Sequence, residues 1–478
     1  MKLRKLIAVL AAILMVVSMM PLSVFAEMGG DFPWTDTSEK MLIEEILERD
    51  GLIDGVWFPW LDGGRCGHNL TGNDLYAKYY NAPQNSSKFV DWNAVELDRL
   101  GADKIYRQIY NLKAMGYNMM AYAGSIYAEG VVFDDNGDVI GIKEEYLTNA
   151  RRLLDMCREI GMPVMWNVYF HSSTTASYYG IDGWKVICQM LGNPEVANHY
   201  AEKFVRPLCE MLAEYPDVVA LVSIADEPEN EINDDGIGDH FGNDRAMYGV
   251  NQDDMVYFMQ QINQVVREEL PGVARTVASN NGNKAIYRDF DLDLAGHNQY
   301  TDGDSFVSVE SLITDADPIL TEYNIGGYNF FDDDVYADKL ITFRRWMMNN
   351  GYKGGFQWCW LPDGASNPNQ PGSAYYLLRN GKDDTSFRKT VTLLKQYMDE
   401  YRAAYRGETL VLDAPTLYAN AGDGKVLFIP SKRATTITIQ RSDDSGKTWK
   451  TVLNNATQSN YVDAYLIGSY TDSTAPAT

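Results

Sequence analysis

The stretch "DVVALVSIADEP" (217–228) decides how the rest of the chain is interpreted. An apolar, partly β-branched run ends there in two adjacent carboxylates, Asp226 and Glu227, followed by a proline. A short apolar run bounded by turn-forming residues is typical of a buried β-strand. The two carboxylates are therefore either functional groups at the end of a strand or only a charged turn, and the surrounding pattern must distinguish the two.

Similar runs recur along the chain and alternate with longer segments of helical period. With the first stretch they make eight, and the other seven cover residues 51–58, 117–123, 162–170, 274–279, 291–298, 317–323 and 353–360. Eight strand–helix units over about 350 residues predict a (β/α)8 barrel. A doubly wound open sheet also alternates in this way, but it more often carries a glycine-rich phosphate turn after its first strand. The loop at 59–74 has neither phosphate-binding pattern, which favours the barrel.

The flanking segments predict four further parts of the chain. Residues 1–26 have a basic start, an apolar run and small residues before a cleavage site, as in a secretory signal peptide; an uncleaved membrane anchor is the alternative. An N-terminal segment (27–49) then precedes the barrel (50–406). Short alternating strands at 407–470 predict a small β-sandwich-like domain, and 471–478 reads as a linker-like tail. Within that domain "SDDSGKTW" (442–449) resembles the Asp-box of sialidase-type propellers, and a single copy indicates a hairpin turn.

The amino-acid composition limits the kinds of molecule that the protein is expected to bind. The formal net charge of −25 disfavours binding to nucleic acid or to anionic lipid, and it suits a secreted, monomeric protein with a neutral substrate. We therefore expect no membrane association after signal cleavage. The five cysteines form no CxxC pair, so we expect separate buried thiols; they are Cys66, Cys157, Cys188, Cys209 and Cys359.

The barrel hypothesis places particular side chains at the functional end. Active sites of such barrels lie at the carboxyl ends of the strands, where the fourth strand ends in Asp226-Glu227 and the seventh in Glu322. Two carboxylates that face each other across the mouth suit glycoside hydrolysis, in which one donates a proton and the other attacks or stabilises an oxocarbenium-like centre. A separation of about 5–5.5 Å between them gives retention, and a wider gap that admits water gives inversion. The other candidates at or near strand ends, which we expect to bind substrate, are Asp226, Asn167, His171, His297, Tyr300, Trp358, Trp360 and Trp60.

These motifs resemble glycoside hydrolase clan A, most of all family 5, over about residues 50–405. In that clan the fourth strand ends in Asn-Glu-Pro and the seventh in a motif like "PILTEYN" (318–324). The resemblance implies that Glu227 is the acid/base and Glu322 the nucleophile. Asp226 replaces the clan's asparagine, which holds the sugar 2-hydroxyl. An ionised carboxylate there can accept a hydrogen bond but cannot donate one.

The sequence therefore predicts a secreted, retaining glycoside hydrolase that acts on a β-linked polysaccharide or oligosaccharide. A catalytically inactive, carbohydrate-binding barrel of the cell surface is the alternative. A metal-dependent barrel hydrolase would show His-x-His after the first strand, and the five histidines form no such pair. We expect no cofactor and no metal.

Overall fold

The computed structural model describes most of the barrel and parts of the C-terminal region. The predicted signal peptide (1–26) and two candidate site residues, Trp60 and His171, lie outside the described residues. The described residues are 40–59, 61, 70–71, 92, 105–125, 128–170, 176–232, 250–280, 290–301, 316–325, 333–360, 389–408, 415–421, 425–429, 436–457 and 468–475.

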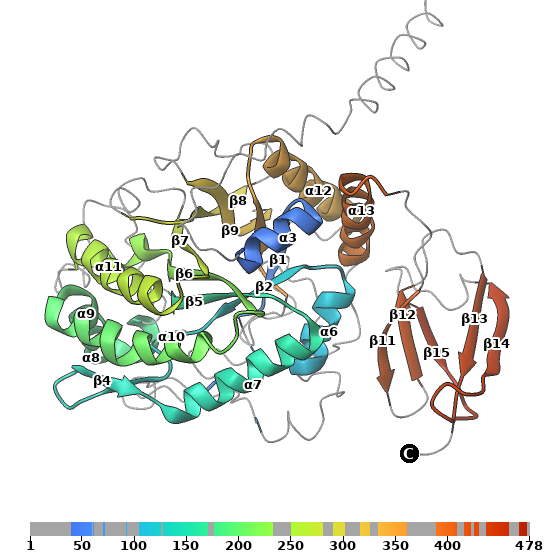
Figure 1. Ribbon diagram of the computed structural model, residues 1–478, viewed down its shortest axis with the longest axis horizontal. Coiled ribbons are helices and arrows are strands. Elements are labelled where there is room, and N and C mark those ends of the chain that lie inside the picture. The colour runs from blue at the N-terminus through green and yellow to red at the C-terminus, as the bar shows by residue number, and fades with distance from the viewer. Residues whose placement is uncertain are drawn as a thin grey trace, which may run out of the picture.

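Eight parallel strands close into a barrel in the order β1-β10-β9-β8-β7-β6-β5-β2, so the predicted (β/α)8 barrel is confirmed (Figure 1). Each predicted apolar run contains or overlaps one of these strands. Their bounds are β1 (Ile53–Trp57), β2 (Met119–Ala123), β5 (Val164–Phe170), β6 (Val219–Asp226), β7 (Ala274–Asn280), β8 (Leu294–Thr301), β9 (Asp317–Ile325) and β10 (Gly354–Gln357).

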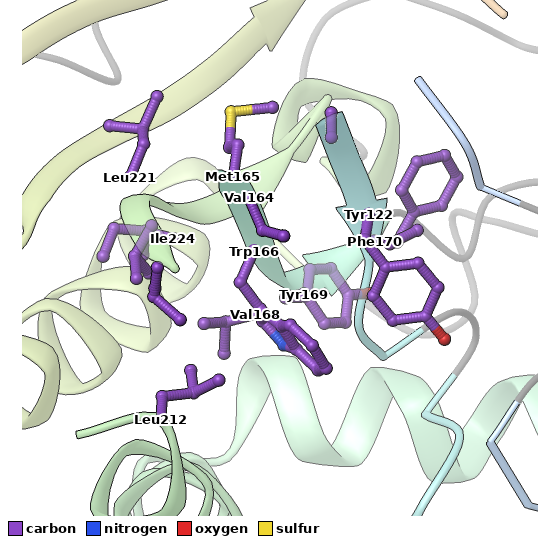
Figure 2. Packing of buried hydrophobic residues seen from close by; sticks show 14 of the residues in the cluster. Tyr122, Val164, Met165, Trp166, Val168, Tyr169, Phe170, Leu212, Leu221 and Ile224 are labelled. Atoms are coloured by element: carbon purple, nitrogen blue, oxygen red, sulfur yellow. The ribbon is translucent and has the colours of Figure 1, made fainter. Parts of the chain in front are cut away.

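The strands are apolar because both of their faces are covered. Every residue of β5 and β6 is buried, as expected where helices pack outside and side chains fill the barrel inside. Figure 2 shows this packing around β5, where Trp166, Val168 and Tyr169 lie among side chains of β6 and Leu212 of α10. Tyr169 makes an edge contact with Phe258 of α11, with ring centroids 5.2 Å apart.

Helices surround the barrel between most pairs of strands (Figure 1). The first, α3 (Leu42–Asp50), precedes β1 and begins inside the predicted N-terminal segment. The others are α6 (Ile105–Ala114), α7 (Glu144–Ile160), α8 (Ala176–Gly192), α9 (Pro194–Tyr200), a π segment (Ala201–Val205), α10 (Arg206–Leu212), a 3-10 turn (Pro228–Glu231), α11 (Gln252–Glu269), α12 (Asp333–Asn349) and α13 (Lys389–Tyr405). A hairpin of β3 (Val131–Phe133) and β4 (Val139–Ile142) is inserted before α7.

Two small antiparallel sheets follow the barrel. One contains β11 (Thr416–Ala421), β12 (Lys425–Ile429) and β15 (Gly468–Thr471); the other is the hairpin of β13 (Thr436–Arg441) and β14 (Lys450–Thr457). The Asp-box-like turn joins β13 to β14, and the Asp444 carboxylate accepts hydrogen bonds from the Thr448 backbone and hydroxyl. The hydroxyl of Tyr110 in α6 donates to the Leu417 carbonyl, which links the first sheet to the barrel.

Within the described ranges, no helix combines the length and apolar character needed to cross a membrane. The four cysteines that the structure describes are buried, as expected; they are Cys157, Cys188, Cys209 and Cys359.

Candidate active site

The carboxyl end of β6 breaks its regular backbone between two acidic residues. Asp226 is the last residue of the strand and is fully buried, whereas Glu227 is only partly buried. Glu227 has a left-handed backbone, with φ 43° and ψ 49°, and its N–H donates to the Ala278 carbonyl of β7 at 2.7 Å. A left-handed conformation at a non-glycine residue costs about 1–3 kcal/mol and is enriched at functional sites. The strand end is therefore a strained turn that presents a carboxylate.

Asn298 of β8 connects the two acidic residues across the intervening strand β7. Its Nδ2 donates to Asp226 Oδ1 at 3.3 Å and to Glu227 Oε1 at 3.0 Å. Thr321 Oγ1 donates to Asn298 Oδ1 at 2.9 Å, on the side of the amide away from the carboxylates. One amide therefore fixes the relative positions of Asp226 and Glu227.

Glu322 lies on β9 beside the same strand β8. Its Cα pairs with that of Asn298 in the parallel ladder, and its Oε2 accepts a 2.6 Å hydrogen bond from the Tyr300 hydroxyl. Asn298 and Tyr300 are two residues apart, so they face the same side of β8. This geometry brings Glu227 and Glu322 to one end of the barrel, as the sequence predicts.

The carboxylates in this group influence one another electrostatically. Burial raises the pKa of Asp226 well above its usual range, and the charges of Glu322 and Glu227 raise it further. Burial and the charge of Glu227 likewise raise the pKa of Glu322, while the Tyr300 hydrogen bond opposes that shift. Like charges at close range in a desolvated site cannot all be ionised. The surroundings therefore favour the protonated forms of Asp226 and Glu322.

A short turn supports Glu227 from the other side. Asn230 Nδ2 donates to Glu227 Oε2 at 2.6 Å, and Asn280 Nδ2 of β7 donates to Asn230 Oδ1 at 3.3 Å. Glu229 in the same turn is buried, and it accepts hydrogen bonds from the Ser279 hydroxyl and from the Asn280 N–H. Both carboxylate oxygens of Glu227 thus have amide donors, one from its own turn and one from β8.

Aromatic side chains gather at the ends of neighbouring strands. Trp358, which a cis peptide bond joins to Cys359, stacks on Phe170 with centroids 6.3 Å apart and lies 5.7 Å from Trp57. Trp57 Nε1 donates to the Thr321 carbonyl, next to Glu322. Trp358 is partly exposed, so it is the member of this cluster that can offer a ring face to a bound molecule.

Three predicted binding residues lie elsewhere. His297 is fully buried, and its ring stacks on Tyr352 with Nε2 3.1 Å from the Tyr352 hydroxyl; burial lowers its pKa to about 4. Successive side chains of a strand point to opposite faces, and Asn298 and Tyr300 face the carboxylates. The His297 side chain therefore points to the other face of β8. Trp360 is fully buried and donates through Nε1 to Gln108 of α6 at 2.9 Å. Asn167 is also buried, and it donates to Ser223 Oγ at 3.1 Å. These placements correct the expectation that His297 and Trp360 lie at the site.

Asn298 and Asn230 were missed in the sequence. Their positions were visible in the sequence, because one amide directly follows His297 and the other lies three residues after Glu227. Amides at such positions are common in turns and strand ends, and only their contacts distinguish these two. Among the residues that the structure describes, no group of three or more His, Cys, Asp or Glu is arranged to hold a metal ion.

Comparison with known proteins finds similar solved structures but no similar sequence. No protein-family model and no curated protein sequence matches the chain. Similar solved structures include a beta-mannanase from the blue mussel Mytilus edulis, at 14% identity over 63% of this chain and 87% of that one, with a TM-score of 0.44. A beta-1,4-D-mannanase from Cryptopygus antarcticus has 15% identity, coverage of 65% and 84%, and a TM-score of 0.44. A beta-glucosidase from Thermotoga maritima has 13% identity, coverage of 74% and 98%, and a TM-score of 0.47. The barrel fold itself is shown by the closed eight-stranded sheet, and at these TM-scores the similarity carries no argument.

Proposed function

We propose that this protein is a retaining β-glycoside hydrolase, in which Glu227 is the acid/base and Glu322 is the nucleophile. The observation that carries the proposal is the convergence of these two carboxylates, from the fourth and seventh barrel strands, on Asn298 and Tyr300 of β8. The reaction needs two carboxyl groups at one site, one that donates a proton and one that attacks as a carboxylate.

The residues would divide the reaction into two displacements. Glu227 donates a proton to the leaving glycosidic oxygen while Glu322 attacks the anomeric carbon and forms a covalent glycosyl ester. Glu227, now a carboxylate, then takes a proton from water, and that water cleaves the ester and restores Glu322. The amide donors from Asn298 and Asn230 support the ionised form of Glu227 between the two steps.

The net charge of the chain and the partly exposed Trp358 suggest the class of substrate. We propose a neutral, β-linked polysaccharide or oligosaccharide, because the strongly acidic chain repels anionic polymers and Trp358 offers an aromatic face on which a sugar ring stacks. We also propose that the mature protein is secreted, on the basis of residues 1–26, and that it works as a monomer.

The test replaces each catalytic carboxylate by its isosteric amide. Purified protein is first assayed on a panel of polysaccharides and aryl glycosides. On any substrate that is cleaved, Glu227→Gln and Glu322→Gln should each lower kcat/KM by at least about 10²–10⁴-fold. The matched control is Glu210→Gln, because Glu210 is exposed on α10.

The stereochemistry of the product tests the mechanism. Proton NMR of the first product should show the anomer of the substrate, whereas the opposite anomer would indicate an inverting enzyme. Survival of hydrolysis in both amide variants would refute the residue assignment. Polysaccharide binding without release of reducing ends would instead support the carbohydrate-binding alternative.

A further inference from the structure

Asp226 differs in its surroundings from the buried aspartates elsewhere in the barrel. Asp293, just before β8, accepts hydrogen bonds from the backbone and guanidinium of Arg275 at 2.8 and 3.1 Å. Asp54 of β1 lies 3.0 Å from the guanidinium of Arg344. Each of these carboxylates thus has a cation that supports its charge. Asp226 is equally buried but lies in a group of carboxylates.

Acidic groups face Asp226 from three directions. Glu227 follows it in the chain, Glu229 lies in the next turn, and Glu322 approaches from β9. The Asn298 amide of β8 also contacts Asp226, through a hydrogen bond from Nδ2 to Oδ1. Burial and the charge of its acidic neighbours disfavour an ionised Asp226, whereas the hydrogen bond from the Asn298 amide favours it.

The orientation of Asn298 determines which oxygen of Asp226 could carry a proton. The Asn298 Nδ2 donates to Asp226 Oδ1 and Glu227 Oε1, and the Asn298 Oδ1 accepts from the Thr321 hydroxyl. Oδ1 therefore accepts a hydrogen bond, and a proton on Asp226 belongs on Oδ2. This leaves the acid with one accepting and one donating oxygen, as in an asparagine side chain.

We propose that Asp226 is a neutral carboxylic acid in the working protein and acts as a positioning residue for Glu227. Its Oδ1 holds Asn298, and Asn298 in turn holds Glu227. Because Asp226 adds no negative charge, the Glu227–Glu322 pair can share a single proton and keep one ionised member. The consequence for catalysis rests on the proposed hydrolase function, whereas the protonation state of Asp226 does not.

Infrared difference spectroscopy tests the protonation state directly. The spectrum of the full-length protein minus that of Asp226→Asn at pH 7 should contain the carbonyl stretch of a protonated carboxylic acid. The matched control is Asp293→Asn, which should show only the loss of ionised carboxylate bands because Asp293 is paired with Arg275. A difference spectrum for Asp226→Asn with carboxylate bands alone would overturn the proposal.

The pH dependence of unfolding gives a second measurement that needs no substrate. A carboxyl group that stays protonated in the folded state takes up a proton on folding, so the parent protein loses stability as the pH rises above the unfolded pKa of about 3.9. The ratio of its unfolding constant to that of Asp226→Asn should rise about tenfold per pH unit above pH ~4. A ratio that does not change with pH would contradict a neutral Asp226.

The pH–rate profile links the protonation state to the reaction. If Asp226 is neutral, Asp226→Asn removes no charge, so both limbs of the kcat/KM profile should stay at the same pH whatever happens to the rate. A shift of the limbs to lower pH would show that the parent residue was ionised. A parent protein without hydrolytic activity would refute the proposed function, and the infrared and unfolding measurements would still decide the state of Asp226.

Discussion

Glu229 lies two residues beyond Glu227 and contributes no charge to the proposed chemistry. Burial raises its pKa from 4.5 to about 7, although hydrogen bonds from Ser279 and Asn280 oppose that shift. This carboxylate connects the strained turn after β6 to the end of β7. Its ionisation near neutral pH therefore changes the support of the turn that carries Glu227.

The first prediction concerns the pH dependence of stability in Glu229→Gln. A raised folded pKa means that ionisation of Glu229 costs stability, which is lost as the pH rises from 4.5 through about 7. Relative to the parent, the variant should gain up to about 3 kcal/mol in free energy of unfolding over that range, from 1.36 kcal/mol per pKa unit. Urea denaturation at several pH values measures this difference.

The control for Glu229 is a glutamate whose pKa is lowered on folding instead of raised. A hydrogen bond from Arg151 lowers the pKa of the exposed Glu214, so Glu214→Gln should remove stability that is present only above the unfolded pKa. That effect should be small because the pair is exposed. A gain in Glu229→Gln that does not vary with pH would mean that Glu229 is not titrating in this range.

Strand β8 is the element that organises the site. Its Asn298 and Tyr300 contact the carboxylates of β6 and β9, while His297 and Gln299 occupy the other face. Its neighbours can pack closely because residue 296 is a glycine. A Cβ at Gly296 would lie 2.5 Å from Thr276 Oγ1, 2.5 Å from the Val277 carbonyl oxygen and 2.6 Å from Thr321 Cγ2.

The second prediction follows from this close approach. Gly296→Ala should destabilise the protein by about 1–3 kcal/mol, because the added methyl group overpacks the contact of β8 with β7 and β9. It should also lower activity through displacement of Asn298 and Thr321. The control is Gly272→Ala, where a Cβ would meet no atom within 4 Å, and it should change stability by less than about 0.5 kcal/mol. Equal urea midpoints for the two variants would refute the packing argument.

At the scale of the whole molecule, a buried ion cluster joins the first strand to the last helices. Asp54 of β1 pairs with Arg344 of α12 at 3.0 Å and with Arg402 of α13 at 3.4 Å. Residues far apart in the chain are thereby fixed at the seam where β1 pairs with β10. The cluster supports closure of the barrel by contacts that are independent of the strand ladder.

The third prediction tests this seam. Asp54→Ala should lower the free energy of unfolding by about 3–5 kcal/mol, since it leaves two buried guanidinium groups without their carboxylate. The control is Asp217→Ala, which breaks the exposed Arg158–Asp217 pair and should cost about 0–1 kcal/mol. A loss in Asp54→Ala no larger than in this control would show that strand pairing alone closes the barrel.

Most of the barrel could be predicted because its strands are buried on both faces. Such strands must be continuous apolar runs, and the eight runs coincide with the eight strands of the closed sheet. Glu227 and Glu322 were identified for the same reason, since each stands at the carboxyl end of a run. The facing of other residues was harder to predict. Alternation along β8 separates His297 and Gln299 from Asn298 and Tyr300, but it does not say which pair faces the mouth.

The amino-acid sequence alone was sufficient to predict the eight-unit barrel and the position of Glu227 and Glu322 at its functional end. Both follow from local hydrophobic pattern and strand order, which neighbouring residues specify. Three features became visible only in the folded barrel. Asn298 bridges Asp226 and Glu227, and Tyr300 contacts Glu322. His297 and Trp360 face away from the site. These contacts join distant parts of the chain, and three of the five span more than 70 positions. These contacts form only when the barrel closes. Closure also buries Asp226 and Glu322, which raises the pKa of both carboxyl groups. A local sequence pattern specifies neither effect.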